Sequence, residues 1–220
     1  MKSHAKKPAL LLPWTSIERV KSISDNIFGF AMTLLIIGIH IPKLSKNISD
    51  TELLAQIAAQ WPEFTTYILS FLNISNYWML HNGVFNCLAR TDKTLIQLNT
   101  LFLLTVTFLP YPTALHGIYG RHSAVALVYG LAIVINYSLL FVAARYALSK
   151  PELLIPNLHF PIRKALAFKL LLPLGLAIMG TILAFLFVRL SFLFFFLVPL
   201  SNAIPWRWII SESNNQTSNH

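Results

Sequence analysis

Charge and cysteine are both scarce in this sequence. Charged side chains make up only 11% of its 220 residues, far fewer than a soluble globular protein carries. The single cysteine, Cys87, excludes an intrachain disulfide and a cysteine-based metal cluster, and we expect it to be a buried, small apolar side chain. No HExxH sequence, paired acidic motif or nucleophile with a positioned base stands out, and the histidines are dispersed. These absences argue against an enzyme and against a metal site.

Hydrophobic residues dominate instead. They make up 55% of the chain, and the mean hydropathy is +0.62. A helix of roughly 20 apolar residues crosses the ~30 Å hydrocarbon core of a bilayer. The sequence therefore predicts an all-α integral membrane protein with six transmembrane helices, near residues 20–41, 61–85, 94–117, 122–147, 165–187 and 190–210. The second is the least apolar, so it should be an inner helix that faces protein or water.

The positions of lysine and arginine predict the orientation. Most of the 17 basic residues lie in the N-terminal segment, the loops after the second and fourth predicted helices, and the C-terminal segment. Because basic residues accumulate on the cytoplasmic side, both termini should be cytoplasmic. Topology thus explains the net charge of +9, and nucleic acid is not expected as a partner. The chain divides into a cytoplasmic segment (1–19), a transmembrane domain (20–210) and a flexible polar tail (211–220).

Polar side chains of the first three predicted helices fall at one depth. Asp25, His81 and Asn99 each lie about five residues, or ~7 Å, from the cytoplasmic end of their helix. A carboxylate facing lipid there costs on the order of 2–3 kcal/mol, so Asp25 should face protein. Its candidate partners are Ser24, His81, Asn99 and Arg19. The cluster is either an ion or proton site or a hydrogen-bonded lock between helices, and the lock is the simpler interpretation.

An apolar stripe follows Asp25 along the first predicted helix. Its members recur at spacings of three and four residues, as one helix face requires: Ile27, Phe30, Leu34, Ile37 and Ile41. Thr33 lies beside it. Such a stripe is either an ordinary lipid-facing or packing surface or, where symmetry brings copies of the helix around an axis, a hydrophobic constriction that gates by dewetting.

Three stretches resemble the transmembrane protein 175 potassium channels. RVKSISD followed by NIFGFAMTLL resembles the R-x-x-x-F-S-D signature that opens the first helix of that family, with Ile23 in the place of the phenylalanine. SNYWMLHNGVF resembles the family's tryptophan and histidine segment, and LNTLFLLTVTFLPYPTALHG resembles its asparagine followed by a proline-bounded helix end. The three occur in the family's order between Arg19 and Gly117.

The resemblance implies a cation channel, selective for potassium in many members, in which the first helix of each subunit lines the central pore of a homotetramer. Phe30, Leu34 and Ile37 would form the constriction, with Ile27 and Thr33 lining it as well. The family usually carries isoleucine or leucine where Phe30 stands. The residues implied in the supporting polar network are Arg19, Ser24, Asp25, Trp78, His81 and Asn99.

We therefore predict a leak-like potassium channel of modest selectivity, multi-pass in the plasma membrane of a prokaryote, with a hydrophobic constriction as gate and filter. Its partners are copies of itself, the lipid bilayer and monovalent cations, and it needs no cofactor. No TVGYG-like carbonyl filter and no row of voltage-sensing arginines occur. Apolar side chains favour potassium because it loses hydration more cheaply than sodium. The alternative is a proton-coupled transporter in which Asp25 and His81 titrate.

Overall fold

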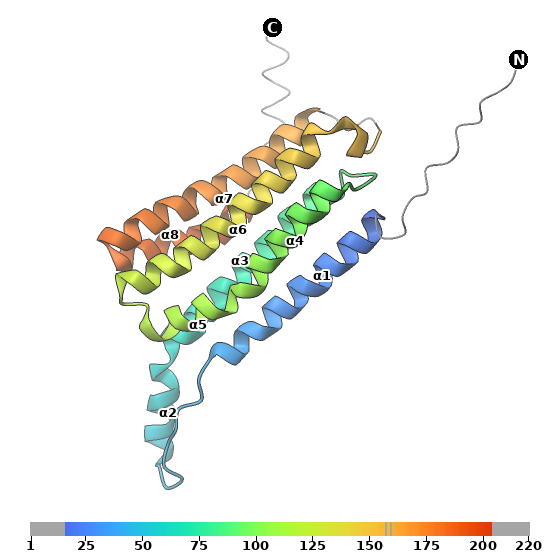
Figure 1. Ribbon diagram of the computed structural model, residues 1–220. Coiled ribbons are helices and arrows are strands. Elements are labelled where there is room, and N and C mark those ends of the chain that lie inside the picture. The colour runs from blue at the N-terminus through green and yellow to red at the C-terminus, as the bar shows by residue number, and fades with distance from the viewer. Residues whose placement is uncertain (1–15, 157, 159, 204–220) are drawn as a thin grey trace, which may run out of the picture.

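The chain folds as a bundle of α-helices (Figure 1). The structure is a computed structural model that describes residues 16–156, 158 and 160–203. The predicted tail (211–220) and most of the predicted N-terminal segment (1–19) lie outside these residues. The helices are α1 (Ile17–Leu34), η2 (Leu35–Gly38), α2 (Asp50–Ala59), α3 (Trp61–Phe85), α4 (Lys93–Phe108), α5 (Pro110–Tyr119), α6 (Ser123–Ser149), η3 (Pro151–Leu153), α7 (Phe160–Leu186), α8 (Val188–Leu200) and η4 (Ser201–Ala203).

In the described part of the chain, helices lie within each predicted transmembrane range, and the all-helical class is confirmed. Residues 204–210 of the sixth predicted range lie outside the described residues. In the described part of the chain, 4 helical stretches are long and apolar enough to cross a membrane: Ile17–Gly38, Lys93–Tyr119, Ser123–Ser149 and Ala165–Leu186. The helix α8 is apolar but shorter. The helix α3 is long, but its polar residues distinguish it from these four.

The polar residues of α3 point into the bundle, as predicted for an inner helix. Ser70 is buried, and its hydroxyl lies 2.9 Å from that of Tyr129 on α6. One turn and a half further on, the buried Asn76 donates a 2.8 Å hydrogen bond to the Tyr137 hydroxyl, also on α6. Since buried polar groups are stable only with hydrogen-bond partners, these bonds fix which face of α3 meets α6.

Proline divides the third predicted range in two. The helix α4 ends at Phe108 with Leu109 as its C-cap, and Pro110 is the first residue of α5. Proline supplies no backbone donor and its ring clashes with the preceding turn, so a break is expected there. In α7, by contrast, Pro173 lies inside a continuous helix.

The helix α1 lies at one edge of the bundle, against α3 and α4, while α7 and α8 form the opposite edge (Figure 1). Its buried residues recur every three or four positions: Ile17, Val20, Ser24, Phe28, Ala31 and, in η2, Leu35. This spacing defines a single helix face that packs on the bundle. The other described residues leave the remaining face of α1 uncovered.

The helix α2 was not predicted. It projects from the end of the bundle at which α1 finishes (Figure 1), and none of its residues is buried. Ser49 and Glu52 form a capping box. The Ser49 hydroxyl accepts a hydrogen bond from the backbone N–H of Glu52, and the Glu52 carboxylate accepts one from the backbone N–H of Ser49. The sequence Ser-x-x-Glu was the available signal for this helix.

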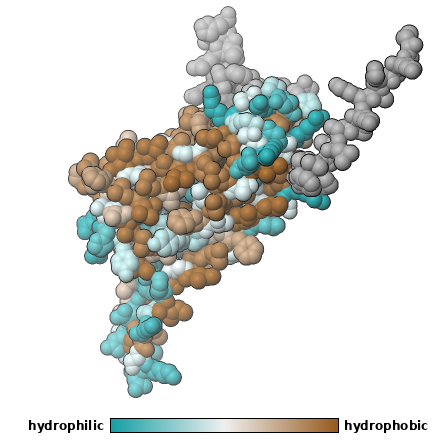
Figure 2. All heavy atoms as spheres, viewed as in Figure 1, coloured by the Kyte–Doolittle hydropathy of each residue, from teal (hydrophilic) through white to brown (hydrophobic). Residues whose placement is uncertain are grey.

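Apolar residues dominate the face seen in Figure 2, and hydrophilic residues gather at its ends and on α2. Large hydrophobic side chains such as Leu131 and Ile135 of α6 and Ile178 and Ile182 of α7 are exposed. A belt of this kind between polar ends is the surface that a lipid bilayer covers.

Candidate functional site

The apolar stripe predicted on α1 is largely exposed in the single chain. The side chains of Phe30, Leu34 and Ile37 are 69%, 42% and 74% exposed. Ile27 differs, since it is half-buried and packs against the core. The bundle therefore leaves Phe30 and Ile37 free to meet something outside the chain.

Thr33 lies on the same exposed face, between Phe30 and Ile37. Its hydroxyl donates a 2.9 Å hydrogen bond to the backbone carbonyl oxygen of Phe30. Because a hydroxyl has one proton and two lone pairs, this bond uses the only donor. The exposed oxygen of Thr33 is left as an acceptor.

A buried hydrogen-bonded triad joins α1, α3 and α4 on the opposite side of α1. The Asn99 amide nitrogen donates to the Ser24 hydroxyl oxygen at 3.0 Å, and His81 Nε2 lies 2.9 Å from the Asn99 amide oxygen. Since that oxygen can only accept, His81 carries a proton on Nε2. The Ser24 hydroxyl completes the chain by donating to the carbonyl oxygen of Val20 at 2.8 Å. Three of the predicted network residues are thus brought into contact.

Aromatic rings enclose the histidine of this triad. The His81 ring stacks on Phe85 with ring centroids 4.0 Å apart and meets Phe28 edge-on at 5.4 Å. His81 Nδ1 is buried without a hydrogen-bond partner among the described residues. An apolar cage that offers hydrogen bonding on one side only holds the ring in one orientation, as a structural lock requires.

Asp25 forms a separate contact at the edge of the bundle. The indole Nε1–H of Trp78 donates a 2.8 Å hydrogen bond to its Oδ1 atom, and both side chains are exposed. His81 bonds to Asn99 and Asp25 to Trp78, so the two residues of the transporter alternative do not form a direct pair. Arg19 is exposed and makes no hydrogen bond or ion pair among the residues that the structure describes. The predicted network therefore falls into a buried triad, an exposed pair and a separate arginine.

Lys21 adds a contact that sequence reasoning missed. Its ammonium group donates a 2.8 Å hydrogen bond to the amide oxygen of Asn86, just after the end of α3. Together with the Asp25 pair, this bond ties the first turns of α1 to the last turns of α3. The sequence carried no signal for this contact, because the i, i+4 rule relates residues of one helix only.

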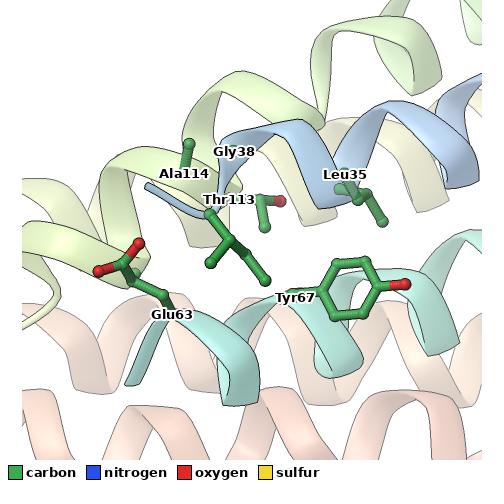
Figure 3. Close-up of a pocket in the computed structure, with 8 residues that line it drawn as sticks. Leu35, Gly38, Glu63, Tyr67, Thr113 and Ala114 are labelled. Atoms are coloured by element: carbon green, nitrogen blue, oxygen red, sulfur yellow. The ribbon is translucent and has the colours of Figure 1, made fainter. Parts of the chain in front are cut away.

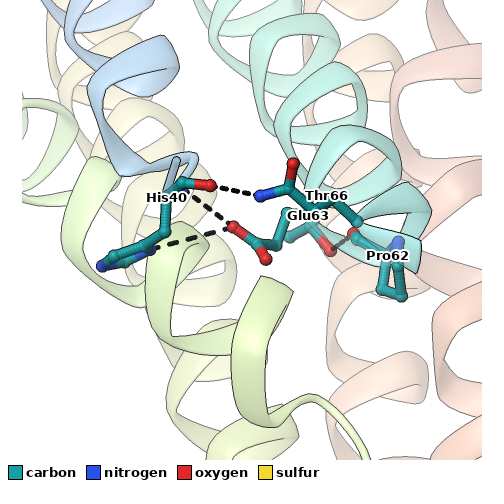
Figure 4. Close-up of polar contacts among 5 residues, drawn as sticks. His40, Pro62, Glu63 and Thr66 are labelled. Atoms are coloured by element: carbon teal, nitrogen blue, oxygen red, sulfur yellow. Dashed lines mark hydrogen bonds and ion pairs between the residues drawn. The ribbon is translucent and has the colours of Figure 1, made fainter. Parts of the chain in front are cut away.

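A second anchor holds the other end of the α1–η2 segment (Figure 4). The Glu63 carboxylate of α3 accepts a 3.0 Å hydrogen bond from the backbone N–H of His40 and lies 3.8 Å from His40 Nδ1. The Gln60 amide donates to the carbonyl oxygen of His40. Nothing in the sequence pattern pointed to this pair.

A small pocket adjoins this second anchor (Figure 3). Leu35 and Gly38 of η2, Tyr67 of α3, and Thr113 and Ala114 of α5 are among the residues that line it. At Gly38 a Cβ atom would lie 3.0 Å from that of Ala114, so any larger residue would require η2 or α5 to shift slightly. Close approach of η2 to α5 therefore fixes where the α1 segment ends.

Metal coordination has no support in the described part of the chain. It contains no group of three or more histidine, cysteine, aspartate or glutamate side chains that could hold a metal ion. The uncovered face of α1 instead presents apolar side chains, the Thr33 hydroxyl oxygen and the exposed amide of Asn26.

Comparison with known proteins places these features in a family context. The sequence model described as "Endosomal/lysosomal potassium channel TMEM175" matches residues 19–110, which contain α3, α4 and all of α1 except Ile17 and Glu18. A potassium channel of Streptomyces collinus is 36% identical over 152 residues, covering 67% of this chain and 72% of the relative. A potassium channel of Chamaesiphon minutus is 36% identical over 104 residues, covering 47% of this chain and 51% of the relative.

A more distant relative and a solved structure are channels as well. The human endosomal/lysosomal proton channel TMEM175 is 25% identical over 184 residues, which is 84% of this chain but only 35% of the human protein. The crystal structure of a lysosomal potassium-selective channel TMEM175 homolog from Chamaesiphon minutus matches with a TM-score of 0.73 and 27% identity, covering 86% of this chain and 96% of that one. The helical arrangement is therefore shared with a channel.

Proposed function

Since the chain belongs to the TMEM175 family of ion channels, we propose that it is a potassium channel whose pore is lined by α1. The chain is a channel subunit rather than an enzyme. The observation that carries the role of α1 is the composition of its uncovered face. Alongside Phe30 and Ile37, that face carries Ser22, Asn26 and Thr33.

The exposed faces of α6 and α7 lack such polar residues at mid-length. The exposed large side chains of α6 are Val128, Leu131, Ile135 and Val142, and α7 presents Leu171, Ile178, Ile182 and Phe185. An amide such as Asn26 facing hydrocarbon is costly because lipid offers no hydrogen bond. The α1 face therefore suits water and other subunits, whereas the faces of α6 and α7 suit lipid.

One α1 helix cannot enclose a pore, so copies of the chain must meet at this face. We propose a homotetramer with four α1 helices around its axis, as the family resemblance implies. The edge position of α1 in the bundle supports this arrangement, since its uncovered face is accessible to neighbouring subunits (Figure 1).

Each subunit crosses the membrane six times, with α1–η2, α3, α4–α5, α6, α7 and α8 as the spans. The predominance of lysine and arginine at the end where α1 begins makes that end cytoplasmic and puts both termini there. The bacterial relatives support a location in the plasma membrane of a prokaryote. In this arrangement α2 and the His40–Glu63 anchor lie outside the cell.

The constriction consists of rings of Phe30, Leu34 and Ile37, with Thr33 among them and Ile27 at the margin. An ion that passes apolar rings loses part of its hydration without compensation from carbonyl oxygens, so selectivity is modest and favours potassium. The buried Ser24–Asn99–His81 triad and the Asp25–Trp78 pair set the rotation of α1, while Arg19 stands at the cytoplasmic entrance. Permeation needs no cofactor.

The reversal potential tests this proposal. Purified protein is reconstituted in a planar bilayer with potassium on one side and sodium on the other, with and without a proton gradient. A reversal potential displaced toward the potassium equilibrium potential, independent of the proton gradient, is the expected result. Absence of current, together with solute flux that follows the proton gradient and disappears in Asp25→Asn, would replace the channel with a transporter.

The oligomeric state is tested separately by native mass spectrometry of the detergent-solubilised protein. Four subunits per particle are expected. A monomer that still conducts after reconstitution would contradict the role of α1 as one wall of a shared pore.

A further inference from the structure

Asn26 lies at the centre of the uncovered face of α1. It precedes Phe30 by four residues and Thr33 by seven, so the three side chains share one helix face. Along the helix axis, Asn26 is about 6 Å from Phe30 on the side where α1 begins, and Thr33 is about 4.5 Å away on the other side. The aromatic ring is thus bracketed by two oxygen-bearing side chains.

The Asn26 amide is available for an external ligand. It makes no hydrogen bond within the described part of the chain, and both it and its neighbour Ser22 are exposed. Gly29, which follows it on the same face, has nothing within 4 Å of the position of a Cβ atom. The surroundings of the amide on this face are therefore open.

The chemistry of the two oxygens suits a monovalent cation. An amide oxygen is a neutral acceptor with two lone pairs, and the Thr33 oxygen is restricted to an acceptor role because its proton is donated to Phe30. Rings of neutral carbonyl oxygens replace the hydration shell of potassium in other channels. Nothing in Phe30 itself can do so.

We propose that four Asn26 amides form a cation-binding ring on the cytoplasmic side of the Phe30 constriction. This inference rests on the proposed function, in which α1 lines the pore. The ring binds a partly hydrated potassium ion through its amide oxygens before the ion passes Phe30, and the Thr33 oxygens meet it on the far side. Asn26 is accordingly a residue that determines conductance and ion preference, separate from the gate.

Two substitutions of Asn26 test the proposal through different measurements. Asn26→Ala removes the ring of oxygens, and single-channel potassium conductance should fall by about threefold or more, the factor expected for losing one modest polar contact. Asn26→Asp creates a ring of carboxylates, which binds divalent cations strongly. Cytoplasmic Mg²⁺ should then block the current in a voltage-dependent manner, and more strongly than in the unmodified channel.

Thr100→Ala is the matched control. Thr100 is an exposed polar residue of α4, about 10 Å from the start of its helix compared with about 14 Å for Asn26. Its hydroxyl is already bonded to the carbonyl oxygen of Ile96. Conductance and Mg²⁺ sensitivity should be unchanged in this variant.

The two proposals fail in different ways. Suppose that the unmodified protein carries potassium current and that Mg²⁺ blocks Asn26→Asp no more strongly than the unmodified protein. The proposal of an amide ring is then wrong, while the proposed channel function is retained. If Asn26→Ala conducts like the unmodified protein, the ring is overturned as well. If the unmodified protein carries no current at all, the proposed function itself fails.

Discussion

The indole N–H of Trp78 donates a 2.8 Å hydrogen bond to the carboxylate of Asp25, and this bond joins α1 to α3 at an exposed position. On the neighbouring side of α1, Ser24 belongs to a buried triad with Asn99 and His81. Two consecutive residues of α1 thus make contacts of different kinds. Solvent or a neighbouring subunit can compensate for loss of the first contact but not of the second.

A double-mutant cycle on Asp25 and Trp78 should reveal their coupling. Asp25→Asn and Trp78→Phe each weaken the bond while retaining the approximate side-chain shape, so the double variant should be less destabilised than the sum of the two. Contacting pairs show interaction energies of about 0.5–3 kcal/mol. Thermal unfolding of the detergent-solubilised protein measures the three variants. Strict additivity would mean that the bond contributes nothing to stability.

Asn99→Ala should destabilise the protein more than either of those single substitutions. It leaves the Ser24 hydroxyl without its donor and His81 Nε2 without its acceptor, both buried. A buried polar group without a partner costs about 1–3 kcal/mol, and this substitution leaves two such groups. The apparent melting temperature is the measurement, and Thr100→Ala, which removes an exposed hydroxyl on the same helix, is the control. Equal melting temperatures for the two variants would rule out the lock.

Phe30→Ala should widen the constriction. Conductance should rise severalfold and the potassium-to-sodium permeability ratio should fall toward one, because a wider passage lets both ions keep their hydration. Phe108→Ala is a suitable control, since Phe108 is an exposed ring on α4. Single-channel recording distinguishes the two variants. A Phe30→Ala channel with unchanged conductance would show that the ring does not line the narrowest passage.

Periodicity predicted the helices well but could not identify the uncovered face of α1. Apolar residues occur all around this helix, so the predicted stripe was drawn through Ile27, and Asn26 was not considered. The structure settles the choice because the Ser24 and Phe28 side faces the bundle, which turns Asn26 outward and Ile27 toward the core. Rotation about a helix axis depends on packing partners, which a single sequence does not contain.

Contacts between distant residues were predictable only where depth in the membrane constrained them. Asp25, His81 and Asn99 were grouped because three consecutive spans put them at one level, with Ser24 as a candidate partner of Asp25. The structure brings His81 and Asn99 into contact with Ser24, whereas Asp25 bonds to Trp78 instead. The His40–Glu63 contact was not anticipated. A loop and α2 separate these two residues, and no rule of helix geometry relates residues on either side of such a segment.

Glu63→Gln and Glu63→Ala should separate the charge of the second anchor from its hydrogen bond. Glutamine can still accept from the His40 backbone N–H, whereas alanine leaves that donor unpaired. Hydrogen bonds to charged groups contribute about 1.5–3 kcal/mol, so the His40 amide should exchange its hydrogen about tenfold faster or more in the alanine variant. Hydrogen exchange followed by mass spectrometry measures this, with Glu152→Gln, in an exposed pair with Lys150, as the control. No change in either Glu63 variant would mean that the end of η2 is held by packing on α5 alone.

Cys87 should react slowly with maleimide in the folded protein. It lies in the loop after α3, where its side chain is buried and its Sγ atom contacts the carbonyl oxygen of Gly83 at 3.4 Å. Burial raises the pKa of the Cys87 thiol. Since the thiolate is the reactive form, a raised pKa lowers reactivity at neutral pH, and reactivity should increase as the pH rises. Labelling of folded and denatured protein, followed by intact mass, compares the two rates. Equal rates would mean that this loop opens readily, and that pairing of Leu88 with Leu154 does not hold the cytoplasmic end of the bundle closed.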